Sequence, residues 1–312
     1  MTLAGRPLSL LLVAAALSSG ACAAGSAGST SGAGGGGATS GEGGSGTGTG
    51  TTGAGGAEPM IDAGGTGGGG PGGGCSVAAT RVYLLAKGQE LHSFDPATLA
   101  LSKVGALACP GSGAATPFSM SVDRSGKAWV LYNDGQLFNV DTETAACQKT
   151  AFVSGQGGFT KFGMGFVSDA VGGDAESLYV ANADGIAKLD TTTLSIAPIG
   201  AFGFAAMAEL TGTADARLFG FFYGFPPYIA QIDKATSTPL AEAPLDTIDA
   251  GTGFAFAFWG GDFWIFTATS DSDSQIHRYA PATQATTQVK ASVGFKVVGA
   301  GVSTCAPLEV PK

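Results

Sequence analysis

Residues 129–144 read WVLYNDGQLFNVDTET, and residues 178–193 read LYVANADGIAKLDTTT, so the chain carries one pattern twice. Each copy has an apolar run, a turn at Asp-Gly, a second apolar run, and then an Asp followed three residues later by a Thr. Two apolar runs that flank a short turn with glycine are typical of a β-hairpin, because glycine readily adopts the positive φ that such turns require. The sequence therefore predicts at least two equivalent hairpins.

The Asp-x-x-Thr ending recurs along the chain at a regular interval. Four copies begin at Asp95, Asp141, Asp190 and Asp233, and a fifth keeps the frame with Ala280 in place of the Asp. The intervals are 46, 49, 43 and 47 residues, which places the chain among repeat architectures with a period near 45. An Asp side chain can accept a hydrogen bond from a backbone N–H two residues on, so we interpret the Asp and the Thr as turn residues.

A second repeated element lies upstream of four of the endings, and its fifth copy follows the last ending. In this element small residues alternate with larger ones. The five copies are FSMSV from Phe118, FGMGF from Phe162, AAMAE from Ala205, FAFAF from Phe254 and VGAGV from Val298. In a strand, alternate residues share a face, so each copy has one face of Ser, Gly or Ala only. Such a strand can pack very close to its equivalents, as the innermost strands of a propeller with few blades must.

Each period divides into four predicted strands; in the second period they cover 117–123, 127–133, 136–141 and 146–153. Four strands in each of five periods resemble an all-β fold, the five-bladed β-propeller. The first copy, 82–109, lacks an innermost strand, and 297–305 supplies a spare one at the C-terminus. The resemblance therefore implies that the C-terminal strand completes the first blade and closes the ring, which leaves no free sheet edge.

The N-terminal residues 1–22 have the layout of a secretory signal, with one basic residue and an apolar run over 8–17. The segment Ser19 to Cys22 resembles a bacterial lipobox, whose cysteine is lipidated, although its first position is usually Leu. Ordinary cleavage after Ala23 is the alternative. Residues 23–74 are the predicted disordered tether, because 25 of the 50 residues in 25–74 are Gly, and such a segment cannot bury enough apolar surface to fold. Residues 75–312 form the predicted propeller domain.

Four cysteines remain after Cys22, and an even number in an exported chain suggests two disulfides with three possible pairings. The ring closure implied by the propeller resemblance would bring Cys305 next to Cys75, where a disulfide would lock the ring. Cys109 and Cys147 would then form the second pair.

The signal, the tether and the five periods together resemble a group of exported bacterial propeller lipoproteins that have no assigned biochemical role. The resemblance implies a lipid anchor in the outer membrane or at the cell surface. The formal net charge of −9 argues against nucleic acid and anionic membrane surfaces as partners. We expect a monomer that meets the membrane only through its anchor, and a glycan, a peptide or an envelope protein as its partner.

Ligands of propellers generally meet the face formed by the loops that enter the inner strands and the loops between second and third strands. The candidate ligand-binding residues in these loops are Tyr223, Phe225, Tyr228, Asn133, Asp134, Asp184 and Asp249. Carboxylates and amides beside aromatic rings would suit a sugar or a peptide. The alternative is that Asn-Asp-Gly and Ala-Asp-Gly are ordinary hairpin turns.

Asp271 and Asp273, in the loop SDSDS, are candidate calcium ligands, although an ordinary solvated loop has the same composition. The sequence suggests no other cofactor.

An enzyme is the less favoured interpretation, and we predict no catalytic residue. A polysaccharide hydrolase needs two carboxyl groups that flank one bond. The nearest acid before an inner strand is Asp249, whereas Glu209 is expected at or beyond the opposite end of its strand. We therefore expect a binding or interaction module; a secreted hydrolase or lyase and a structural envelope protein are the alternatives.

Overall fold

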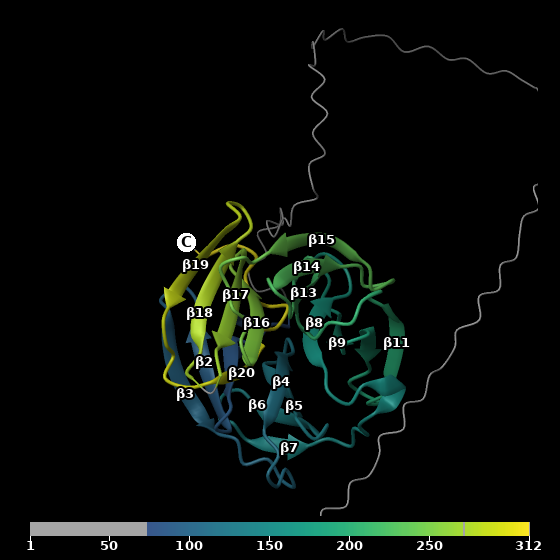
Figure 1. Ribbon diagram of the computed structural model, residues 1–312. Coiled ribbons are helices and arrows are strands. Elements are labelled where there is room, and N and C mark those ends of the chain that lie inside the picture. Colours follow the sequence, from purple (N-terminus) through teal and green to yellow (C-terminus); the bar gives the residue numbers. More distant parts are fainter. Residues whose placement is uncertain (1–73, 271, 312) are drawn as a thin grey trace, which may run out of the picture. The chain divides into compact units, whose positions relative to one another are not determined.

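The computed structural model describes residues 74–270 and 272–311, which form five four-stranded antiparallel sheets arranged as the blades of a five-bladed β-propeller (Figure 1). The predicted fold class is therefore confirmed. In Figure 1 the inner strands surround the centre, and the outermost strands β3, β7, β11, β15 and β19 lie at the periphery.

The strands of each blade are given from the axis outward. Blade 1 comprises β20 (Val297–Gly301), β1 (Val82–Ala86), β2 (Glu90–Asp95) and β3 (Ala100–Ala106). Blade 2 comprises β4 (Pro117–Val122), β5 (Lys127–Tyr132), β6 (Leu137–Asp141) and β7 (Cys147–Lys149). Blade 3 comprises β8 (Gly163–Ser168), β9 (Glu176–Ala181), β10 (Gly185–Leu189) and β11 (Ile196–Ala201). Blade 4 comprises β12 (Ala208–Gly212), β13 (Leu218–Phe222), β14 (Tyr228–Ile232) and β15 (Pro239–Pro244). Blade 5 comprises β16 (Gly253–Trp259), β17 (Asp262–Ala268), β18 (Gln275–Ala280) and β19 (Ala285–Lys290). Two short 3₁₀ helices, η1 (Ala78–Thr80) and η2 (Gln156–Gly158), lie in the connections.

The ring closes as the repeat predicts. The C-terminal strand β20 pairs antiparallel with β1, with Tyr83 opposite Gly301. A disulfide joins Cys75 to Cys305, across a sequence separation of 230 residues, and a second joins Cys109 to Cys147. Both predicted pairings are therefore confirmed, and the first blade is built from the two ends of the domain.

The Asp-x-x-Thr endings are turns. In the second blade, Asp141 Oδ1 accepts hydrogen bonds from the backbone N–H groups of Glu143 (2.9 Å) and Thr144 (2.8 Å). The hydrogen bond that the Thr144 hydroxyl donates, together with these backbone bonds, holds the pKa of the Asp141 carboxyl below its usual range. The residue after the Thr has a positive φ in all five copies, and these residues are Leu99, Ala145, Leu194, Ser237 and Gln284. The carboxylate therefore stabilises a chain reversal in which a non-glycine residue adopts the left-handed conformation.

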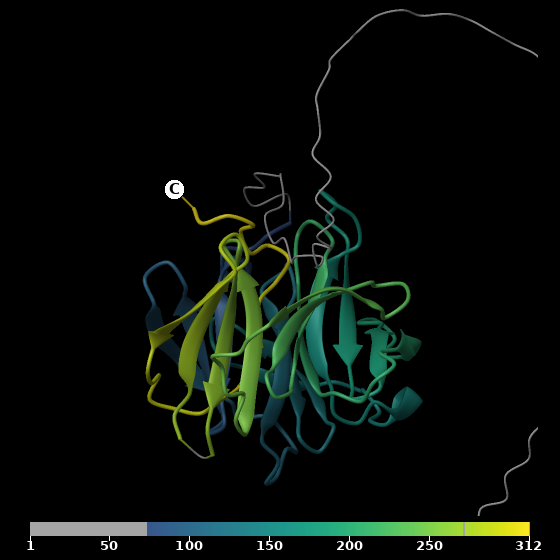
Figure 2. The same ribbon diagram turned by 45° about the horizontal axis from the view of Figure 1, so that its top comes forward.

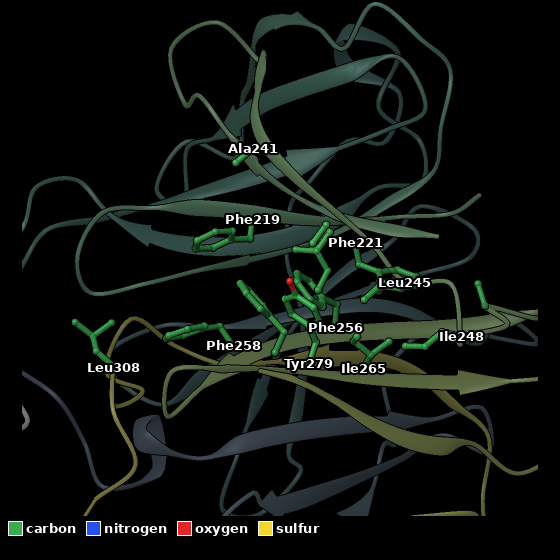
Figure 3. Close-up of a cluster of buried hydrophobic side chains, with 14 residues drawn as sticks. Phe219, Phe221, Ala241, Leu245, Ile248, Phe256, Phe258, Ile265, Tyr279 and Leu308 are labelled. Carbon is green, nitrogen blue, oxygen red and sulfur yellow. The ribbon is translucent and has the colours of Figure 1, made fainter. Parts of the chain in front are cut away.

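Buried aromatic and aliphatic side chains fill the space between neighbouring blades. Figure 3 shows the cluster between blades 4 and 5, where Phe219 and Phe221 of β13 lie against Phe256 and Phe258 of β16. Four further clusters of this kind occur among the described residues. The sheets are therefore held together face to face by apolar packing, which is the main stabilising term in folding.

The small face of the inner strands brings neighbouring backbones into close contact, as expected from four of the five copies. A Cβ atom added at Gly163 of β8 would lie 2.1 Å from the backbone oxygen of Ala208 in β12. Similarly, Ser121 Oγ of β4 accepts a hydrogen bond from the backbone N–H of Phe166 in the next blade (3.0 Å).

The prediction for the fourth blade was wrong in register. Its inner strand begins at Ala208, so AAMAE is mostly a connection rather than the strand. Thr211 Oγ1 accepts a hydrogen bond from Phe258 N–H in blade 5 (3.0 Å), and so corresponds to Ser121. Two residues earlier, Glu209 therefore occupies the position of Ser119. A large carboxylic side chain thus lies on the face that, in the other four inner strands, has only Ser, Gly and Ala.

Close packing of the inner strands gives a testable prediction. A Cβ at Gly212 of β12 would lie 2.2 Å from the backbone oxygen of Phe166, so Gly212→Ala forces the two strands apart. We expect it to lower the free energy of unfolding by about 2 kcal/mol, measured by urea denaturation. Gly88→Ala is the matched control, because nothing lies within 4 Å of its added Cβ. Equal stability of the two variants would contradict the close packing.

Over the described residues, no helix has both the length and the apolar character to cross a membrane.

Candidate functional site

A cavity of about 520 Å³ lies on the propeller axis, at the end where the five inner strands begin. We call it the axial pocket. Residues of all five blades line it. They lie around the start of each inner strand and in the loops β1–β2, β5–β6 and β9–β10. Its volume is within the range of about 300–1,000 Å³ that is usual for small-molecule sites.

The walls of the axial pocket are largely apolar. Phe118 of β4, Phe162 just before β8 and Phe254 of β16 contribute aromatic rings, and Met207 and Val298 add aliphatic surface. Met207 is 48% exposed, so it stands at the mouth rather than in the core. Phe204 is not part of the lining; its ring stacks against Phe202, and β12 begins four residues later.

Three lysines line the axial pocket. They are Lys87 in the β1–β2 loop, Lys161 before β8 and Lys296 before β20. The Lys296 ammonium is fixed in place, because Nζ donates hydrogen bonds to Thr252 Oγ1 (2.9 Å) and to the backbone oxygen of Ser270 (2.5 Å). Sequence reasoning missed all three residues, although Lys161 and Lys296 stand directly before the repeated inner strands.

Glu209 supplies the carboxyl group of the pocket lining. The residue is 4% exposed, and Ser119 Oγ of β4 donates a hydrogen bond to its Oε2 (2.8 Å). Burial raises the pKa of the carboxyl well above its usual range, and the Ser119 hydrogen bond opposes this only in part. The carboxyl is therefore held in its neutral form at pH values where an exposed glutamate is charged. The expectation that Glu209 lies at the opposite end of its strand was wrong, and the register of β12 is the reason.

Asn133 is the one predicted ligand-binding residue that lines the axial pocket. Its Oδ1 accepts a hydrogen bond from Thr116 N–H (3.2 Å), and its Nδ2 donates to Thr116 Oγ1 (3.2 Å). Asn182 lies in the equivalent place in blade 3 and accepts hydrogen bonds from the N–H groups of Asp184 and Gly185. Both amides thus shape loops at the rim of the pocket.

The three predicted aspartates do not line the axial pocket. Asp134 Oδ1 accepts a hydrogen bond from Gln136 N–H (3.1 Å), and Asp249 Oδ1 accepts one from Gly251 N–H (2.9 Å). Asp184 is exposed in the β9–β10 turn. The geometry of Asp134 and the place of Asp184 in the β9–β10 turn agree with the hairpin-turn interpretation, and the Asp249 carboxylate also bonds to the backbone two residues on.

The aromatic loop 223–228 lies next to the pocket wall. The Tyr223 ring stacks on Phe254 (centroids 5.8 Å apart) and meets Phe225 edge-on (5.5 Å). Phe225 is 82% exposed. Tyr228, by contrast, begins β14 and stacks on Phe222 (5.0 Å), where burial raises its pKa to about 12, with a smaller contribution from Glu242. The structure therefore places Tyr223 and Phe225 beside the axial pocket, and Tyr228 in the packing of its own blade.

Two predicted sites fall partly or wholly outside the described residues. The candidate calcium site is the first: Asp271 lies outside the described residues, and its predicted partner Asp273 accepts a hydrogen bond from Ser292 Oγ (3.0 Å). The second is the predicted lipidation site, Cys22, which also lies outside the described residues. Within 74–270 and 272–311, no group of three or more His, Cys, Asp or Glu side chains is arranged to hold a metal ion.

The chain enters the propeller at the face opposite the axial pocket. Ser76 N–H donates a hydrogen bond to the backbone oxygen of Arg124, in the β4–β5 turn where inner strand β4 has ended. Trp259 Nε1 donates to the backbone oxygen of Thr80 at the β16–β17 turn of the same face (2.9 Å). The C-terminal segment, yellow in Figure 2, crosses this face, and the backbone oxygen of Pro307 accepts a hydrogen bond from Gly260 N–H.

Comparisons with known proteins give similarity in fold alone. No protein-family model and no curated protein matches the chain. Among solved structures, a protein of unknown function from Bacteroides thetaiotaomicron is 9% identical, with a TM-score of 0.44, over 71% of this chain and 60% of that chain. TolB from Acinetobacter baumannii is 13% identical, with a TM-score of 0.42, over 69% and 54%. A protein of unknown function from Bacteroides caccae is 10% identical, with a TM-score of 0.40, over 68% and 73%. The chain therefore spans less than two thirds of the first two of these proteins, and similarities this remote carry no argument about function.

Proposed function

We propose that this protein is an exported binding module, tethered to the cell envelope through Cys22 and residues 23–74, whose recognition site is the axial pocket. The observation that carries the proposal is the pocket itself, because all five blades line one cavity of ligand size on the propeller axis. The two disulfides support export, since such bonds persist mainly outside the cytosol.

The point where the described chain enters the propeller supports the same function. It enters at Cys75, on the face opposite the axial pocket. The described N-terminal residues therefore leave the mouth of the pocket uncovered. Tyr223 and Phe225 would extend the aromatic wall at the mouth, where they could stack on a sugar ring or a peptide side chain.

A polysaccharide hydrolase is less well supported. Hydrolysis of a glycosidic bond normally uses two carboxyl groups placed on either side of it. Among the described residues that line the axial pocket, Glu209 alone carries a carboxyl group. The described lining thus offers the features of a binding site, and the paired carboxyl groups of this chemistry are not among its residues.

We expect a ligand to raise the thermal stability of the oxidised full-length chain, and we expect the rise to depend on the pocket. The first measurement is the unfolding temperature with soluble glycans, sugar acids, peptidoglycan fragments and short peptides. A ligand at 100 times its Kd adds about 2.7 kcal/mol to the free energy of unfolding. Met207→Trp, which fills the mouth, should abolish the shift.

Val171→Trp is the matched control, because it adds the same group at a site that is 76% exposed and outside the pocket. A shift that survives Met207→Trp would move recognition to another surface. No shift with any member of the panel would favour the structural alternative.

A further inference from the structure

The charge of the axial pocket differs from the charge of the chain. The chain has 15 Lys and Arg against 24 Asp and Glu, yet three of those 15 line this one cavity. The lysines come from three separate connections in blades 1 and 3, so their convergence results from the fold and not from a basic run in the sequence. Among the described residues of the lining no Asp is present. A pocket lined by three lysines favours an anionic ligand over a neutral or cationic one.

Glu209 does not cancel the charge of the lysines. Burial raises the pKa of its carboxyl well above the usual range, and among the described residues of the lining the other titratable groups are Lys87, Lys161 and Lys296. A neutral carboxylic acid has one O–H donor and one carbonyl acceptor. With Ser119 donating to Oε2, a proton on Oε1 would make that oxygen a hydrogen-bond donor to a ligand in the cavity that Glu209 lines.

The apolar walls define the rest of the ligand. Rings of Phe118, Phe162 and Phe254 line the same cavity as the lysines and Glu209, and they suit the faces of a sugar or an aromatic ring. A volume of about 520 Å³ holds a small molecule.

We propose, resting on the function proposed above, that the axial pocket binds a small ring-bearing carboxylate. The lysines neutralise its charge, the phenylalanine walls hold its ring, and the Glu209 carboxyl donates a hydrogen bond to one of its oxygens. Sugar acids and aromatic acids share this chemistry, and the experiment below distinguishes them.

The test compares pairs of ligands that share a ring and differ in whether its substituent is a carboxylate or a neutral group. Isothermal titration of the full-length chain at pH 6 measures glucuronate against glucose, and benzoate against benzamide. We expect the carboxylate of at least one pair to bind about tenfold more tightly than its neutral partner, as one charge-assisted hydrogen bond allows. Which pair shows the difference identifies the ring. Equal affinity within both pairs overturns the proposal, and so does tighter binding of glucose 6-phosphate than of glucuronate.

Variants assign the roles of the residues. Lys161→Gln should weaken the carboxylate and leave the neutral partner unchanged, whereas Lys127→Gln, an exposed lysine outside the axial pocket, should change neither. Glu209→Gln keeps a donor and should retain binding, whereas Glu209→Ala should lose about tenfold. Affinity of the natural chain should fall as the pH rises and Glu209 ionises, and Glu209→Gln should remove that pH dependence. A pH dependence that persists in Glu209→Gln contradicts the role of Glu209.

Failure of this proposal can be separated from failure of the binding function. Binding of neutral ligands that Met207→Trp abolishes would retain the axial pocket as a binding site and exclude the carboxylate class. Absence of any binding to the pocket would overturn both.

Discussion

Replacing both Cys75 and Cys305 by serine is expected to lower the free energy of unfolding by about 5 kcal/mol. This disulfide closes a loop of 230 residues, so its removal releases nearly the whole domain in the unfolded state. It also frees β20, which completes blade 1 only by pairing with β1. The loss would be comparable to the entire stability of many domains. Urea denaturation of the oxidised chain and of the double variant measures it.

The second disulfide is the internal control. Cys109 and Cys147 are only 38 residues apart, and the same entropic model gives about 4 kcal/mol for their removal. The Cys75–Cys305 variant should therefore be the less stable of the two. The opposite order would show that closure of the ring does not depend on this bond.

Glu209→Gln is expected to stabilise the protein at neutral pH. The folded state keeps Glu209 protonated well above its usual pKa, whereas the unfolded chain releases the proton near pH 4.3. The natural chain therefore loses about 1.4 kcal/mol for each pH unit between about 4.3 and the raised pKa, and the loss stops above that pKa. Glutamine has no proton to release, so the variant escapes this loss.

The difference in stability between variant and natural chain should thus vanish near pH 4 and grow as the pH rises. Unfolding curves at pH 4, 5.5 and 7 test this sign. Glu143→Gln, which removes one carboxyl group from an exposed glutamate in a turn, is the matched control for the substitution itself. A constant difference across this range would show that Glu209 is ionised in the folded protein.

The fold could be predicted from the sequence because each copy of the repeat forms the same local structure. Each Asp-x-x-Thr ending makes the same backbone turn, so even the copy that has Ala280 keeps the frame and the positive φ at Gln284. The propeller resemblance, with a missing strand at one end and a spare strand at the other, implied the ring closure and, with it, the two disulfide pairings that the structure shows.

The candidate site was predicted less well, and one residue explains much of the failure. AAMAE has the same alternation of small and larger residues as a true inner strand, but β12 begins at Ala208. The predicted strand began three residues too early, and this error placed Glu209 at the end opposite the pocket. Periodicity within one strand cannot reveal such a shift; the contacts of Thr211 and Glu209 with other blades define the register. The sequence did not indicate the three lysines of the axial pocket as site residues, because lysines in loops are usually solvated.

Glu209 has a consequence for the pseudo-symmetry of the molecule. Five similar blades around one axis would offer a ligand five nearly equivalent orientations, each related to the next by a fifth of a turn. At the position of Glu209, β4 has Ser119, and the small face of the other inner strands has Gly or Ala. A single large polar side chain thus breaks the equivalence in a ring of small residues. Because it reaches from blade 4 to Ser119 in blade 2, it marks one direction across the axis, and a ligand bound there would have one orientation instead of five.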